Sequence, residues 1–182
     1  HSHWSEAGEA LKKMDFTFRA AVLRGVWDRL SGMAEESLAE RGLSMDVGHI
    51  SVEEALRLQQ ISTWPGVRRV CEVGFNAGHS AAAVLLAGRD LVAIDVNNDS
   101  YVEAAAATLQ TMFPGKLELV SMDSVEALRV LKLRGVACDL IRIDGSHVDG
   151  MAAADLAASQ HISSGPRFVW MDDVGCSNWN CK

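Results

Sequence analysis

Hydrophobic and polar positions follow two different periods along the chain. Over residues 5–42 apolar side chains recur every three or four positions, which predicts a helix that is interrupted near Gly32 and Gly42. A second helical pattern begins at Ser51, and Glu54 gives this serine the partner of a capping box. The "WPG" that follows ends this second pattern. We therefore expect the first third of the chain to be helical.

From about residue 67 onward, short apolar runs typical of strands alternate with helical runs. This alternation requires right-handed crossovers, so it predicts an α/β fold with a doubly wound, mostly parallel sheet that has helices on both faces. We expect a single domain, in which an N-terminal helical segment (1–66) packs on an α/β core (67–182). The expected strands are 67–74, 90–96, 116–123, 138–145 and 167–174, and the helices between them begin near His79, Tyr101, Ser124 and Val148.

Composition narrows the range of partners. Of the 182 residues 48% are hydrophobic, and the formal net charge is -7. A nucleic-acid-binding protein needs clustered basic residues, and no Lys/Arg cluster here is longer than a pair, so we expect neither nucleic acid nor an anionic membrane as the main partner. No apolar run approaches the ~18 residues of a membrane span, and the first residues lack the features of a signal peptide. These features favour a cytoplasmic protein and leave a homo-oligomer open.

The four cysteines fall into two pairs. Cys71 and Cys138 lie inside apolar, strand-like runs, where a buried free thiol is the usual state. Cys176 and Cys181 lie in the C-terminal tail, where we expect two unlinked thiols in a reducing compartment. A disulfide or a soft-metal pair is the alternative for the tail cysteines.

The unusual polar residues of the predicted sheet fall where the strands end. The carboxyl ends of parallel strands lie at one edge of the sheet, and ligands bind there near the point where the strand order reverses. Five strands that each end in Asp or Glu are hard to explain by structure alone, because an unpaired buried carboxylate is costly. The residues are Glu72 to Ser80, Asp95, Asp123, Asp144, and Asp172 with Asp173.

The turn after the first predicted strand contains two glycines, Gly74 and Gly78. A dinucleotide-binding turn has three glycines so that the backbone can approach a pyrophosphate, whereas here Phe75 to Ala77 crowd those positions. The acidic Glu72 at the strand end repels phosphate but suits an amine or a hydroxyl. The turn therefore favours a nucleoside that carries a charged amino-acid tail.

The stretch "VCEVGFNAGHSA" resembles the first motif of class I S-adenosylmethionine-dependent methyltransferases. The greatest likeness is to the metal-dependent O-methyltransferase branch, which includes catechol and macrolide-sugar O-methyltransferases, and it extends from about Met45 to Asp173. The resemblance implies a Rossmann-like methyltransferase fold. In that family the sheet continues into a final antiparallel pair, whereas this chain stops nine residues after Asp173, so we expect the C-terminal strands to be missing.

The resemblance also implies residues for the cofactor. The segment from Gly74 through Phe75 and Asn76 to Gly78 would pass close to the methionine portion of S-adenosylmethionine. Ser80 would hold its carboxylate, with help from the N–H groups of the helix N-terminus. Glu72 would stand at the acidic position of the motif.

The nucleoside would be bound farther along the sheet edge. Asp95 would accept hydrogen bonds from both ribose hydroxyls, and Asp123 with Ser124 would read the adenine amine. The "MDVGH" segment resembles one that covers the cofactor, which makes Val47 a further candidate contact. Each residue has a simpler alternative: Ser80 as an ordinary helix start, Asp123 as a helix N-cap and Asp95 as a turn former.

A metal centre is implied by the ends of the fourth and fifth predicted strands. Asp144 would lie beside Asp172 and Asp173, and three converging carboxylates repel one another unless a cation neutralises them. Oxygen ligands suit Mg2+ or another hard divalent ion, and these positions match the metal ligands of the family. In the alternative, one aspartate of the final pair caps a loop or faces solvent.

His147 stands at the position that carries the general base in the resembling enzymes, and a neutral-range pKa suits this role. A surface or loop-capping histidine is the alternative. The resulting hypothesis is metal-dependent O-methylation of a small-molecule hydroxyl, with Asp144 and His147 as catalytic residues. A metal-independent N- or protein methyltransferase and a non-catalytic S-adenosylmethionine-binding domain remain alternatives.

Overall fold

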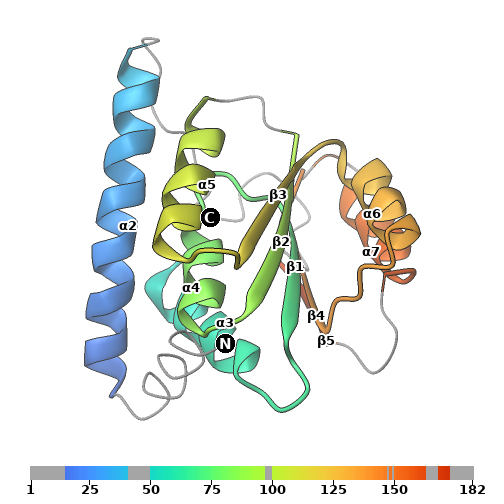
Figure 1. Ribbon diagram of the computed structural model, residues 1–182, viewed down its shortest axis with the longest axis horizontal. Coiled ribbons are helices and arrows are strands. Elements are labelled where there is room, and N and C mark those ends of the chain that lie inside the picture. The colour runs from blue at the N-terminus through green and yellow to red at the C-terminus, as the bar shows by residue number, and fades with distance from the viewer. Residues whose placement is uncertain are drawn as a thin grey trace.

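The computed structural model describes residues 15–40, 50–96, 100–146, 148, 150–162 and 168–172. Helices and strands alternate after two initial helices (Figure 1). In chain order they are α2 (Phe16–Ala39), α3 (Val52–Ser62), β1 (Arg69–Val73), α4 (His79–Leu86), β2 (Asp90–Asp95), α5 (Ser100–Met112), β3 (Leu117–Ser121), α6 (Ser124–Leu133), β4 (Leu140–Ile143), α7 (Met151–Ser159) and β5 (Phe168–Met171).

The five strands form one sheet in the order β3-β2-β1-β4-β5, and every neighbouring pair is parallel. Each predicted strand is present, and each ends one to three residues before its predicted boundary. The order runs outward from β1 in both directions, which is the reversal characteristic of a doubly wound sheet. The predicted fold class is therefore confirmed.

Helices cover both faces of the sheet (Figure 1). The helices α4 and α5 pack on one face with α2 and α3 outside them, and their shared core contains Leu23, Leu58 and Leu109. The helices α6 and α7 lie on the opposite face, where Leu128 and Ile141 belong to a second core.

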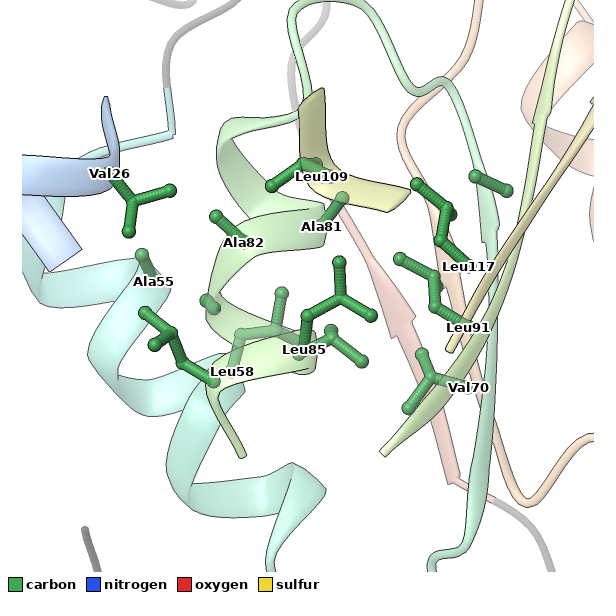
Figure 2. Packing of buried hydrophobic residues seen from close by; sticks show 14 of the residues in the cluster. Val26, Ala55, Leu58, Val70, Ala81, Ala82, Leu85, Leu91, Leu109 and Leu117 are labelled. Atoms are coloured by element: carbon green, nitrogen blue, oxygen red, sulfur yellow. The ribbon is translucent and has the colours of Figure 1, made fainter. Parts of the chain in front are cut away.

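Every residue of α4 is buried. Figure 2 shows the reason: Ala81, Ala82 and Leu85 of this helix lie among residues of the sheet and of the outer helices, such as Val26. Alanine side chains permit the close approach of helix and sheet that this sandwiched position requires. The apolar sequence "AAAVLL" is thus explained by contact on all sides.

Two helical predictions need correction. The helix α2 runs through Gly32 without the predicted interruption, because its buried face packs on α4 and α5 and outweighs the low helix propensity of one glycine. The last helix, α7, begins at Met151 rather than near Val148, because Gly150 precedes it with a φ of 83°. The predicted capping box of Ser51 and Glu54 is confirmed at the start of α3.

The prediction of free thiols at Cys71 and Cys138 is wrong, because the structure joins them in a disulfide. The residue after Cys138 donates its N–H to the carbonyl of Arg69 at 2.9 Å, so the chain before β4 passes close to β1 and the two Cα atoms are 5.8 Å apart. This contact depends on strand order and not on sequence spacing. The tail cysteines lie outside the described residues. Among the described helices, none combines the length and hydrophobicity needed to cross a membrane.

Candidate functional site

The carboxyl ends of the five described strands lie in one row, and backbone hydrogen bonds beyond the sheet hold them there. The N–H of Met122 donates to the Asp95 carbonyl at 2.8 Å, and the N–H of Gly74 donates to the Ile94 carbonyl at 2.9 Å. On the other side of β1, the N–H of Asp144 donates to the last carbonyl of β1 at 2.9 Å. The N–H of Asp172 donates to the last carbonyl of β4 at 3.0 Å. The predicted gathering of polar residues at this edge is therefore present.

A cavity of about 370 Å³ opens at this edge. Its volume lies within the range of small-molecule sites. Apolar side chains such as Phe75, Ile94 and Met122 form part of the wall. The predicted site residues that line it are Gly74, Phe75, Asn76, Ser80, Asp95, Asp123, Ser124 and Asp144.

Asp95 holds the glycine turn through backbone contacts. Its Oδ2 accepts the N–H groups of Phe75 and Asn76, both at 2.9 Å. Asn76 takes a left-handed φ of 49°, and its Oδ1 accepts a hydrogen bond from the Tyr101 hydroxyl at 2.8 Å. Asp95 is thus a turn former, as the simpler alternative proposed. A carboxylate has about four acceptor positions, so this role is compatible with binding hydroxyl groups in the cavity.

The two glycines of the turn are required by the protein's own packing. Gly74 has a φ of +90°, and a Cβ there would overlap the backbone carbonyl of Asp144. A Cβ on Gly78 would lie 2.9 Å from side-chain atoms of Leu109 and Phe75. The cavity wall includes Gly74 but not Gly78. The glycines therefore set the path of the turn and the separation of β1 from β4.

Ser80 and Glu72 form a buried pair below the cavity. The Ser80 hydroxyl donates to Oε1 of Glu72, whose side chain is fully buried. Ser80 lines the cavity and Glu72 does not. Among the described residues no partner reaches Oε2 of Glu72. Glu72 therefore does not face the cavity itself and influences it through side chains that it binds, such as Ser80.

Arg142 is a site residue that the sequence analysis missed. It stands in the middle of β4, is 1% exposed and lines the cavity. Its Nη1 donates to Glu72 Oε1 at 3.1 Å, and its Nη2 donates to Asp144 Oδ2 at 2.5 Å and to Asp172 Oδ2 at 3.2 Å. The available signal was the lone charged residue in the apolar run "LIRI", two positions before Asp144 and so on the same face of the strand.

Burial and charge act in opposite directions in this cluster. Burial raises the pKa of Glu72 to about 7, although the charge of Arg142 and the hydrogen bond from Ser80 oppose the increase. Burial alone would lower the pKa of the Arg142 guanidinium, but the carboxylates of Glu72, Asp144 and Asp172 outweigh it and raise that pKa. The arginine is therefore permanently charged, whereas Glu72 changes its protonation near neutral pH.

Two of the three predicted metal ligands are described, and they already share a cation. Oδ2 of Asp144 and Oδ2 of Asp172 both accept a hydrogen bond from Nη2 of Arg142. Within the described residues, no group of three or more His, Cys, Asp or Glu is placed to hold a metal. The arrangement of these two carboxylates therefore does not fit a divalent cation between them.

The residues predicted to read adenine have local partners. Asp123 is the N-cap of α6, where its Oδ1 accepts the N–H groups of Val125 and Glu126 at 3.1 and 3.2 Å. The hydroxyl of Ser124 donates to Asp155, a buried residue of α7, at 2.5 Å. The N-cap alternative for Asp123 is thus present, and the adenine contact stays a prediction. Val47, His147 and Asp173 lie outside the described residues.

Comparison with known families identifies the core of the chain. Residues 71–174 match a family described as a methyltransferase domain. A comparison with curated proteins found no match.

Solved methyltransferase structures share the fold. The O-methyltransferase TomG from Streptomyces achromogenes, involved in tomaymycin synthesis and solved with SAM, is 20% identical over 78% of this chain, with a TM-score of 0.62. An O-methyltransferase from Bacillus cereus, solved with SAH, is 15% identical over 79% of this chain, with a TM-score of 0.63. The SAH-bound methyltransferase PaMTH1 from Podospora anserina is 16% identical over 82%, with a TM-score of 0.59. This chain spans 64%, 62% and 61% of those chains, respectively, which is less than two thirds of each.

Proposed function

Because the chain belongs to this methyltransferase domain family, we propose that it binds S-adenosylmethionine in the cavity at the carboxyl edge of the sheet and transfers a methyl group to a hydroxyl oxygen of a small molecule. The observation that carries the proposal is the connection of Asp95 with the glycine turn. Both line the cavity, and the two backbone hydrogen bonds fix their relative position.

The chemistry of the wall supports the cofactor. Asp95 offers carboxylate oxygen to paired hydroxyl groups, while Phe75, Ile94 and Met122 offer apolar surface to a flat base. The N-terminus of α4, where His79 and Ser80 line the cavity, offers backbone N–H groups that suit a carboxylate, while the Ser80 hydroxyl itself donates to Glu72. When bound, S-adenosylmethionine would supply the electrophilic methyl group. The side chains of this chain would orient it and exclude water.

The acceptor would lie toward β4. Asp144, Gly145 and Ser146 line this side of the cavity, directly before the predicted base His147. His147 would take the proton of the acceptor hydroxyl, which makes its oxygen the stronger nucleophile that methyl transfer needs. The small-molecule class of the acceptor rests on the volume of the cavity, about 370 Å³, which lies in the range of small-molecule sites.

The predicted Mg2+ has no part in this proposal. Arg142 fills the point between Asp144 and Asp172, so no step is derived through a metal ion.

Calorimetric titration with S-adenosylhomocysteine in the presence of EDTA tests cofactor binding. We expect saturable binding by the wild-type chain and a loss of about tenfold or more in the Asp95→Asn variant, because an amide lacks the charge that strengthens bonds to hydroxyl donors. Asp90→Asn is the matched control: Asp90 lies at the other end of the same strand and pairs with Lys116 on the surface. It should bind as the wild type does.

Equal affinity of the two variants would remove Asp95 from the binding site. Absence of binding by folded wild-type protein, both with EDTA and with added Mg2+, would contradict the proposed cofactor.

A further inference from the structure

The proposed methyl transfer does not by itself account for Arg142. Arginine is almost never fully buried unless it is paired, because taking its charge out of water is costly. Here the side chain is 1% exposed, and the bonds of its two terminal nitrogens go to three different carboxylates. Its planar guanidinium can serve several acceptors at once, which a lysine ammonium cannot do in the same geometry.

The position of Arg142 is set by the sheet. It is in register with Glu72 of β1 on one side and with Trp170 of β5 on the other. Side chains alternate along a strand, so Arg142 points to the same face as Asp144, two residues later. Asp144 and Asp172 each directly follow a paired strand, so the cation and these two partners stand on rigid backbone.

We propose that Arg142 is the fixed cation of this site, in the position between Asp144 and Asp172 that a divalent ion would otherwise occupy. The pocket then binds no divalent cation at these carboxylates. If the proposed function holds, on which this last step rests, methyl transfer proceeds without a metal.

Electrostatics supports the exclusion of a divalent cation from the carboxylates of Asp144 and Asp172. The guanidinium does not lose its proton in proteins, so a divalent ion at the same two oxygens would lie beside a permanent positive charge. In a partly desolvated pocket this repulsion is stronger than it would be in water. Moving Arg142 away would relieve it, but would leave the buried Glu72 without its cation.

The cluster keeps a negative excess without a metal. Glu72, Asp144 and Asp172 carry up to three negative charges against the single positive charge of Arg142. The sulfonium centre of S-adenosylmethionine is itself cationic, so this residual charge favours the proposed cofactor.

Titration with Mn2+, followed by the electron paramagnetic resonance signal of the free ion, tests the inference. The wild-type chain should bind no Mn2+ saturably at millimolar concentrations. A variant that combines Glu72→Gln with Arg142→Met removes the cation together with its buried partner, and should gain saturable Mn2+ binding in the same concentration range. The matched control is Arg134→Met, which removes an arginine from an exposed pair with Glu118 and should leave Mn2+ binding unchanged.

Adding Asp144→Asn to the double variant should abolish the new Mn2+ binding, which ties it to this site. Saturable Mn2+ binding by the wild type that Asp144→Asn or Asp172→Asn removes would overturn the inference. Comparison of the wild type with these two single variants tests the inference even if circular dichroism shows that the double variant does not fold. Failure of the proposed function is distinguishable, because it would appear as absent S-adenosylhomocysteine binding and not as a change in Mn2+ affinity.

Discussion

The two sides of β1 hold their carboxylates by different means. On the β2 side, Asp95 accepts two backbone N–H groups from the glycine turn. On the β4 side, Asp144 and Asp172 are held by the side chain of Arg142. A carboxylate held by backbone N–H groups depends on the path of the chain, and any sequence that makes the same turn provides those N–H groups. A pair held by a side chain depends on that side chain, so its substitution can change the chemistry of the pair.

The largest expected effect comes from removing that residue. Arg142→Met should lower the free energy of unfolding by about 4 kcal/mol, because it leaves Glu72 as a buried carboxylate without its cation. Urea denaturation measures the loss. Arg134→Met, at an exposed pair, should stay close to the wild type. Equal losses in the two variants would show that the buried cluster contributes no more than a surface ion pair.

Gly74 is the point where the two sides touch. Gly74→Ala should destabilise the fold by about 3 kcal/mol more than Gly66→Ala, because a Cβ at Gly74 would overlap the backbone carbonyl of Asp144. Gly66 is a matched control: its φ of +91° equals that of Gly74 to within a degree, but a Cβ there meets nothing within 4 Å. Similar urea midpoints for the two variants would mean that β1 and β4 can separate at little cost.

A smaller effect should follow from pH. Burial raises the pKa of Glu72 to about 7 from its ordinary value of 4.5, so the folded chain binds this proton more tightly than the unfolded chain. The resulting stabilisation is present at low pH and is lost as the pH rises through 7. Between pH 5 and pH 7 it should fall by about 2 kcal/mol.

Urea denaturation of the wild type and of Glu72→Gln across this range isolates the contribution of Glu72. The difference between their unfolding free energies should change in the wild type's disfavour as the pH rises. A difference that is constant with pH would show that Glu72 keeps one protonation state in both folded and unfolded chains.

The sequence was sufficient to predict the fold because strand-like and helical patterns are both read from residues that are close together along the chain. Alternation of strand-like and helical runs requires crossovers, and the crossovers require a parallel sheet. The same locality explains the capping box at Ser51, where donor and acceptor are three residues apart. The predicted break at Gly32 was wrong because the helix α2 is continued there by contacts with α4 and α5, which are distant in the sequence.

The site was predictable only in part, for a related reason. Each acidic residue at the end of a strand could be predicted from its own stretch of sequence. The structure brings Asp95, Asp144 and Asp172 to one edge of the sheet. The link from Arg142 to Glu72 needed the knowledge that β4 pairs with β1, which the chain order does not contain. The disulfide of Cys71 and Cys138 escaped prediction in the same way.

The complete burial of α4 has a practical consequence for choosing fragments to express. The family match begins at residue 71, yet the outer face of α4 is covered by α2 and α3, which precede it. Trp27 of α2 donates its indole N–H to the carbonyl of His79 at 2.9 Å, at the first turn of α4 beside the cavity. A fragment cut at the family boundary would present an apolar helix to water and would be prone to aggregate. Useful expression boundaries therefore lie before Phe16, well upstream of the first glycine of the turn.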